Sequence, residues 1–242
     1  MFGFYSSFIG YPIVARNQRF HGESDSKEKY LKSLSEKPGD WEYRDLAISY
    51  VRNSNGHRSK EISDIDLTNY ILCTGSSTVE GIGLPVEHRY SDVLANLLDT
   101  DVYNLALGGS GNDIIFYNLV TWFTTIKQKP KLVVINWVDE LRYYTEKNKL
   151  VTVNGIWEEK NQEFMLTGDA NGYFHTKTES IKQLTRKIID VPIIEIPWQS
   201  TNNANEFNQE KECIVDLARD SMHPGIKSNK LLAEALYKHA TT

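Results

Sequence analysis

Long apolar runs are absent from this chain of 242 residues. The longest candidate, from Ile114 to Ile126, is interrupted by Asn118 and several threonines. It falls short of the roughly 20 apolar residues that a membrane-spanning helix requires. The first fifteen residues contain no basic side chain ahead of their apolar positions, which is not typical of a secretory signal peptide. We therefore expect a cytoplasmic protein without a membrane partner.

Cysteine is scarce, and neither sign of charge dominates. Cys73 and Cys213 allow at most one bridge, so the chain lacks the disulfide density of a small secreted scaffold. The 27 Lys and Arg against 32 Asp and Glu give a formal net charge of −5, which leaves no global positive field to gather nucleic acid. The mixture of 40% hydrophobic and 24% charged residues is typical of a globular protein, for which no nucleic-acid partner is expected.

From Tyr70 onward, short apolar runs alternate with segments of helical periodicity. The expected strands are 70–74, 101–107, 131–138 and 191–196. The expected helices are 88–99, 112–127, a segment ending at Asp190, and 226–239. This alternation is typical of strands that connect through helices into a parallel sheet. We therefore predict a three-layer α/β/α sandwich with a mostly parallel sheet.

Two segments fall outside this alternation. Residues 1–69 are polar and irregular, and we interpret them as an N-terminal extension packed on a core domain of residues 70–242. An insertion at about 143–176 follows the third strand, so it should rise from the carboxyl edge of the sheet as a lid. Within it, Asn154-Gly155 predicts a tight hairpin turn. His21, Glu23 and Asp25 alternate like metal ligands, but a solvated polar stretch is the simpler interpretation.

A hydroxyl, an imidazole and a carboxylate occur where the chain leaves the predicted sheet edge. Ser77 follows the first strand, and Asp220 and His223 lie three residues apart just before the last helix. A serine hydroxyl is a weak nucleophile unless a base takes its proton, and that base works best when a carboxylate orients it. We therefore expect Ser77 as nucleophile, His223 as base and Asp220 as the group that orients His223.

A glycine-rich turn follows the second strand, in the segment from Asn104 to Asn112. Glycines permit positive φ and close backbone approach, so their N–H groups can face a developing oxyanion. The expected donors are the N–H groups of Ser77 and Gly109 and the side chain of Asn112. Each motif alone is more often a turn or a helix cap, but all of them lie at one predicted edge of the sheet.

These motifs resemble the SGNH, or GDSL-like, hydrolases, a family of flavodoxin-like esterases and deacetylases. Its Gly-Asp-Ser block is similar to Gly75-Ser76-Ser77, with Ser76 in place of the aspartate, and its Asp-x-x-His-Pro block matches residues 220–224. The second block resembles Asn104-Leu105-Ala106 followed by Gly109. The resemblance covers about 70–239, and the stretch 53–58 looks like phage and bacterial members with an N-terminal extension.

The family's third block, Gly-x-Asn-Asp, is missing after the third strand. Either Asn112 or Asn136 would have to replace its asparagine, and Asn112 is the better placed because Asn136 lies inside the strand. Trp137, Arg142 and Trp198 are candidates for binding substrate, since aromatic rings stack on sugars and Arg142 could bind an anion or a hydroxyl. A surface ion pair of Arg142 with Glu140 or Glu146 is an equally good interpretation.

The resemblance implies a serine hydrolase that cleaves a small acyl ester, on a small molecule or a carbohydrate, without metal or organic cofactor. Two alternatives stay open. The altered third block would also suit a binding or structural protein, such as a virion-associated phage component that has lost turnover. The same chemistry would also permit acyl transfer to an acceptor other than water.

Overall fold

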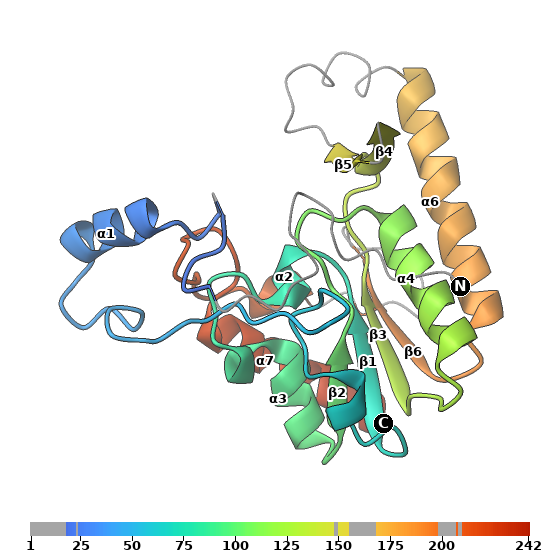
Figure 1. The fold of residues 1–242 in the computed structure, drawn as a ribbon, viewed down its shortest axis with the longest axis horizontal. Coiled ribbons are helices and arrows are strands. Elements are labelled where there is room, and N and C mark those ends of the chain that lie inside the picture. Colours follow the sequence, from blue (N-terminus) through green and yellow to red (C-terminus); the bar gives the residue numbers. More distant parts are fainter. Residues whose placement is uncertain (1–17, 23, 148–149, 155–167, 198–206, 208–209) are drawn as a thin grey trace.

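The computed structural model of the chain describes residues 18–22, 24–147, 150–154, 168–197, 207 and 210–242. A sheet of four parallel strands forms its centre, in the order β2-β1-β3-β6 (Figure 1). The strands are β1 (Tyr70–Thr74), β2 (Asp101–Asn104), β3 (Leu132–Asn136) and β6 (Ile193–Ile196). The chain moves from β1 outward to β2 and then crosses back to β3. The carboxyl ends of β1 and β3 therefore form the topological switch point, where open α/β sheets bind ligands.

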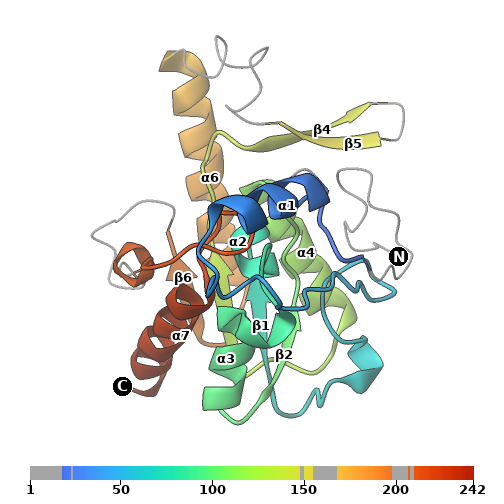
Figure 2. The same cartoon turned by 90° about the vertical axis from the view of Figure 1, so that its left-hand side faces the viewer.

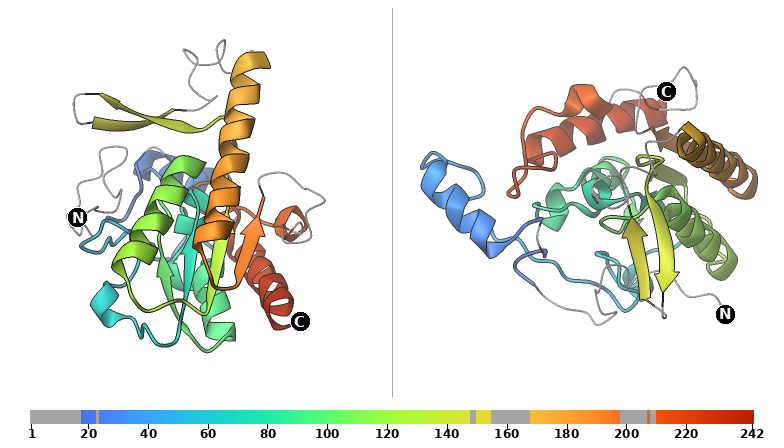
Figure 3. Two further views of the ribbon diagram at one scale, coloured as in Figure 1. Left: turned by 90° about the vertical axis from the view of Figure 1, so that its right-hand side faces the viewer. Right: turned by 90° about the horizontal axis from the view of Figure 1, so that it is seen from above.

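Helices cover both faces of this sheet. Helices α3 (Tyr90–Leu97) and α7 (Ile226–Thr241) lie on one face, and α4 (Asn112–Thr125) and α6 (Gly168–Ile188) lie on the other (Figures 1 and 3). Alternate residues of β1 face opposite layers, so that Cys73 packs toward α3 and α7 while Leu72 packs toward α4. The predicted α/β/α sandwich is confirmed, and apolar side chains of its strands are buried on both faces of the sheet.

The inserted segment contains a hairpin that the sequence analysis did not predict. Strand β4 (Tyr143–Lys147) pairs antiparallel with β5 (Leu150–Asn154), and the register joins Lys147 to Leu150. The Tyr-Tyr-Thr run that opens β4 has the strand propensity typical of aromatic and β-branched residues. The turn that we predicted at Asn154-Gly155 lies partly outside the described residues, because β5 ends at Asn154 and Gly155 is not described. Helix α6 also begins at Gly168, inside the stretch that we expected to be insertion.

The described part of the N-terminal extension, 18–22 and 24–69, contains regular elements and buried side chains that its composition did not indicate. Its helix α1 (Lys27–Glu36) begins after Ser26, whose side chain accepts a hydrogen bond from the Lys29 backbone N–H. A short 3-10 helix, η2, covers Ile62–Asp64. A third cluster of buried side chains joins the extension to the loops around the sheet edge: Tyr43, Ile48, Tyr50, Ile82, Leu84 and Ala218. Figure 2 shows α1 in front of α2 (Ser77–Glu80) and of the segment that precedes α7.

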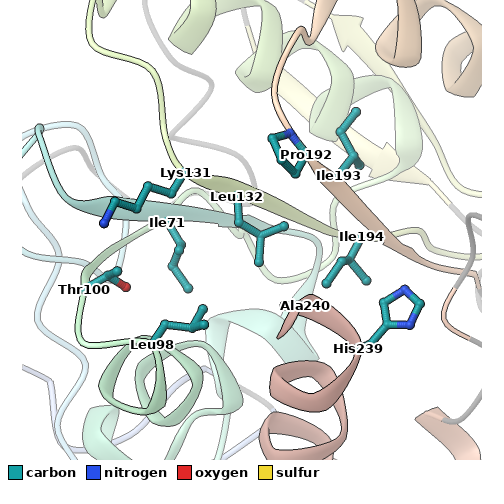
Figure 4. A pocket seen from close by; sticks show the side chains of 10 residues that line it. All are labelled: Ile71, Leu98, Thr100, Lys131, Leu132, Pro192, Ile193, Ile194, His239 and Ala240. Carbon is teal, nitrogen blue, oxygen red and sulfur yellow. The ribbon is translucent and has the colours of Figure 1, made fainter. Parts of the chain in front are cut away.

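A pocket of about 390 Å³ opens at the amino edge of the sheet, where β1, β3 and β6 begin (Figure 4). Apolar side chains such as Ile71, Leu98 and Ile194 point into it, and Lys131 and His239 stand at its sides. It lies at the end of the strands opposite to the switch point. Within the described part of the chain, no helix is long and apolar enough to cross a membrane.

Candidate active site

Ser77 stands directly beyond the carboxyl end of β1. The strand ends at Thr74, and Ser77 is the first residue of the short helix α2 (Ser77–Glu80). Gly75 makes this sharp transition, since an added Cβ there would lie 2.4 Å from Val79 Cγ2 and 3.1 Å from Asn136 Cβ. No larger side chain fits at Gly75 without a shift of its neighbours. The hydroxyl of Ser77 is thereby held at the switch point between β1 and β3.

His223 and Asp220 come from the loop that precedes α7, and the fold brings them to Ser77. The Nε2 atom of His223 lies 2.8 Å from Ser77 Oγ, and its Nδ1 atom lies 2.5 Å from Asp220 Oδ2. The loop conformation is set locally, because Asp220 Oδ1 accepts the backbone N–H groups of Met222 and His223 at 3.1 Å. The three side chains that the sequence singled out therefore form one hydrogen-bonded row.

The charge on Asp220 fixes the proton on the imidazole. Burial alone would raise the pKa of Asp220, but hydrogen bonds from the His223 ring and from two backbone N–H groups outweigh it and lower that pKa. The carboxylate is therefore ionised at neutral pH and accepts hydrogen bonds only. Nδ1 of His223 must then carry a proton, which leaves the lone pair of Nε2 directed at the Ser77 hydroxyl. The side chain of His223 keeps 16% exposure, so a substrate can reach it.

The glycine-rich turn lies beside Ser77. A Cβ added to Gly108 would lie 3.7 Å from Ser77 Cβ, and the hydroxyl of Ser110 donates to the carbonyl of Gly75 at 3.1 Å. Gly109 has φ +82°, a conformation that favours glycine. Its N–H group has no hydrogen-bond partner among the residues that the structure describes. A backbone donor is therefore available in a turn that packs next to the serine.

Asn112 begins α4 and Asn136 lies within β3, as the sequence indicated, but the amide of Asn112 is held by the backbone beyond β3. The amide of Asn112 forms a reciprocal pair with the backbone of Val138, donating to its carbonyl at 3.0 Å and accepting from its N–H at 2.9 Å. This pair fastens the start of α4 to the chain beyond β3. Asn112 is 2% exposed, so its amide serves this internal pair. Asn136 ends β3 and borders Gly75, two residues before Ser77.

Arg142 places a positively charged guanidinium next to Ser76, the residue before Ser77. Its guanidinium donates a hydrogen bond to Ser76 Oγ at 3.1 Å, and its backbone carbonyl packs against Gly111. Burial lowers the pKa of Arg142. Glu140, one of the two expected ion-pair partners, contacts His175 Nδ1 at 3.1 Å, and the side chain of the other, Glu146, lies outside the described residues. Ser76, which precedes the candidate nucleophile, is thus bonded to a positively charged side chain.

Of the two tryptophan candidates, the structure describes Trp137, which does not add to the site. Trp137 is 1% exposed and packs in the core between the sheet and α4, with its indole N–H donating to Glu195 at 3.0 Å. Its predicted role in stacking on substrate is therefore wrong, because its ring is covered by apolar neighbours. Trp198 lies outside the described residues. Within those residues, no group of three metal-ligating side chains comes together.

Sequence reasoning missed a group of buried charges around the site. Glu80, fully buried, pairs with Arg52 and accepts the N–H of Gly108 at 2.5 Å. Asp25, 1% exposed, pairs with Arg219 through two hydrogen bonds of 2.9 and 2.6 Å. His21 is also buried, so the expected solvated stretch around His21 and Asp25 is corrected. The one local signal was a carboxylate at Glu80 inside an otherwise apolar and glycine-rich run.

The ion pair of Glu80 predicts a loss of stability in acid. Burial would raise the pKa of Glu80, but Arg52, His21 and the Gly108 N–H outweigh it and lower that pKa to about 2 from 4.5. A depressed folded-state pKa stabilises the protein above pH 4.5, and this contribution of about 3 kcal/mol disappears as the pH falls towards 2. Urea unfolding should therefore show a difference in the free energy of unfolding between wild type and Glu80→Gln. This difference should become smaller from about pH 7 to about pH 3.

The exposed Glu87 provides the control for this measurement, since Glu87→Gln should leave the acid dependence of wild type unchanged. A gap between wild type and Glu80→Gln that stays constant with pH would contradict the depressed pKa of Glu80.

Several solved structures are similar to this fold. A putative lipolytic protein of the G-D-S-L family from Desulfitobacterium hafniense is 12% identical; the match covers 70% of this chain and 98% of that one, with a TM-score of 0.46. A family two carbohydrate esterase from Clostridium thermocellum is 16% identical over 72% of this chain and 63% of that one, with a TM-score of 0.45. The esterase EstA from Pseudoalteromonas is 15% identical over 70% and 95%, with a TM-score of 0.43. No protein-family model and no curated protein matches the chain.

Proposed function

We propose that the protein is a serine hydrolase that cleaves a small acyl ester. The observation that carries this proposal is the row of hydrogen bonds from Ser77 through His223 to Asp220, with distances of 2.8 and 2.5 Å. A buried carboxylate, an imidazole with a free lone pair and a hydroxyl in this order are the parts of nucleophilic acyl transfer. A partly exposed Ser77 at the switch point gives a substrate access to them.

The proposed reaction follows from the proton positions. Ser77 Oγ attacks the acyl carbonyl as Nε2 of His223 takes its proton, and Asp220 stabilises the imidazolium that results. The tetrahedral intermediate collapses when the imidazolium returns the proton to the leaving alcohol, which leaves an acyl group on Ser77. Water, deprotonated by His223, then attacks the acyl carbon and releases the acid. The second tetrahedral intermediate collapses as the imidazolium returns this proton to Ser77 Oγ, which restores the starting enzyme.

The proposed oxyanion donors are the backbone N–H groups of Ser77 and Gly109. The Ser77 N–H begins α2, so it has no partner within that helix. The Gly109 N–H belongs to the turn packed beside Ser77. Asn112 is left out of this set because Val138 holds its amide. Arg142, bonded to Ser76, supplies a nearby positive charge that favours a substrate with an anionic or hydroxyl group close to the ester.

A fluorophosphonate probe tests this proposal directly, because it forms a stable bond only with an activated serine. Wild type should be labelled at Ser77, with the adduct located by peptide mass spectrometry, and should hydrolyse a short activated ester such as p-nitrophenyl acetate. Prior labelling should remove this hydrolysis in proportion to the adduct. An unlabelled and inactive wild type would favour the alternative of a binding or structural protein. Faster product formation with an added alcohol, together with the alcohol's ester, would instead indicate acyl transfer.

A further inference from the structure

Two buried charge pairs connect the N-terminal extension to the two halves of the candidate site. The first pair joins Arg52 to Glu80, and the second joins Asp25 to Arg219. All four side chains are at most 7% exposed. Apolar side chains of similar volume are often at least as stabilising as a buried ion pair, so stability alone does not account for the placement of these charges.

The Glu80 carboxylate holds the glycine-rich turn. Its Oε2 atom accepts the Gly108 N–H at 2.5 Å, and its Oε1 atom faces Arg52 and, at 3.7 Å, His21 Nε2. Each oxygen of the Glu80 carboxylate therefore faces a different segment: Oε2 accepts from the glycine-rich turn, and Oε1 contacts the N-terminal extension. Because Gly109 follows Gly108 directly, the position of its N–H depends on this contact.

The Asp25 carboxylate holds the loop of Asp220 and His223. Arg219 immediately precedes Asp220, and its guanidinium binds Asp25 through both oxygens at 2.9 and 2.6 Å. Tyr50 adds a second connection, since its hydroxyl donates to Asp25 Oδ2 at 2.5 Å and accepts the Gly83 N–H at 2.8 Å. Gly83, with φ +80°, packs so closely that an added Cβ would lie 3.2 Å from Asp220 Oδ1.

His21 and Asp25 are themselves joined as one unit. The backbone N–H of His21 donates to the carbonyl of Asp25 at 3.0 Å, and the N–H of Asp25 donates to the carbonyl of His21 at 3.1 Å. The ring of His21 also packs against the ring of Tyr50, with 5.1 Å between centroids. The contacts to the glycine-rich turn and to the His223 loop therefore both involve this hydrogen-bonded pair of residues.

We propose that the His21/Asp25 pair is a positioning element, which sets the oxyanion turn against the acid–base loop through Glu80 on one side and Arg219 on the other. The extension is then part of the machinery of catalysis without touching the substrate. This inference rests on the proposed function, because it assigns the two loops the roles of oxyanion donor and base.

Isosteric variants separate positioning from packing. In Glu80→Gln the new NH2 group must face either Arg52 or the Gly108 N–H, so one of the two contacts becomes repulsive. In Asp25→Asn the NH2 group must likewise face Arg219. Displacing a catalytic group by a fraction of an ångström to 1 Å lowers the rate by about tenfold to 100-fold. We expect such losses in kcat for both variants, with KM within about twofold of wild type, because an oxyanion donor acts in the transition state.

The experiment measures kcat and KM on p-nitrophenyl acetate, with kcat divided by the number of sites titrated with the fluorophosphonate. A merely structural role lowers the number of titrated sites and leaves kcat per site unchanged. Lys60→Gln is the matched control: Lys60 also joins the extension to the core, through a 2.7 Å ion pair with Asp101 at the start of β2, away from Ser77. It should keep the kcat per site of wild type.

If either isosteric variant does not fold, two milder variants test the positioning proposal. Tyr50→Phe removes the hydroxyl between Asp25 and Gly83, and His21→Phe keeps the ring packing while removing the contact to Glu80. Each should lower kcat per site by about threefold or more. A kcat per site within twofold of wild type in every folded variant would overturn the proposal.

A wild-type protein that neither turns over nor reacts with the probe would refute the proposed function, and the positioning would then be judged by NMR. The Nδ1–H proton of His223, bonded to Asp220, should give a far-downfield resonance that is absent in His223→Gln. Its displacement or loss in Asp25→Asn or Tyr50→Phe, with no change in Lys60→Gln, would support positioning of the loop. An unchanged resonance in both variants would overturn it.

Discussion

Replacing Ser77 by alanine should lower kcat for an activated acetyl ester by about 10⁴-fold to 10⁶-fold, the range found when the nucleophile of such a row is removed. The reason is that Ser77 Oγ is the only atom in the row placed to form the acyl bond, 2.8 Å from the base. The fold should survive, since Ser77 is only partly buried and its side chain contacts His223. Far-ultraviolet circular dichroism and the urea midpoint should match those of wild type, while initial rates fall to the level of the uncatalysed reaction.

Thr78 offers the matched control for this prediction. It follows Ser77 in α2, is partly buried, and carries a second hydroxyl in the same helix. Thr78→Val removes that hydroxyl with little change of shape, so kcat should stay within a few-fold of wild type. If Ser77→Ala kept most of the activity, or if Thr78→Val lost as much, the nucleophile would be a different residue.

Asp220→Asn should lower kcat by about 10⁴-fold, although the shape of the side chain is unchanged. The carboxylate requires a proton on Nδ1 of His223, whereas an asparagine amide can present its NH2 group to the ring and favour the opposite tautomer. Nε2 would then carry the proton and could not accept the one from Ser77. Because the pKa of Asp220 lies below its ordinary value, the carboxylate is ionised throughout the neutral range. A pH-rate profile should therefore show an equally large loss of kcat in Asp220→Asn across that range.

Asp216 is a suitable comparison for Asp220. Its carboxylate accepts the backbone N–H groups of Lys227 and Ser228 at the start of α7, on the same loop but away from the imidazole. Asp216→Asn should lower the free energy of unfolding by about 1 kcal/mol, as is usual for a helix cap, and leave kcat nearly unchanged. Equal effects of the two substitutions on kcat would mean that Asp220 acts through the stability of the loop alone.

Local patterns were sufficient for the sheet and for the candidate triad. Strand β1 begins and ends where its apolar run does, and α4 and α7 follow the helical periodicity of their sequences within a few residues. The short-range spacing of Asp220 and His223 also placed both side chains on one loop. Each of these features depends on residues that are close together in the sequence, because backbone propensity and hydrophobic periodicity are local properties.

The pairing of strands and the packing of side chains were harder to predict from the sequence. No local signal indicated that β5 would pair with β4, with Leu150 opposite Lys147. Trp137 was assigned to a binding surface because aromatic rings stack on sugars and because it lies near the end of a predicted strand. Its ring turns inward, where Glu195 accepts its indole N–H. Neither outcome can be deduced from residue type, since both depend on which surface lies opposite.

The sequence by itself determined the order of the layers, the strands at the centre, and the presence of a hydroxyl, an imidazole and a carboxylate at one edge. Tertiary structure alone decided that the extension reaches this edge, because Asp25 and Arg219 are 194 positions apart and show no local sign of pairing. A buried charge has the same sequence pattern as a solvated one. Only the folded chain, by removing water from both partners at once, makes the contact between them obligatory.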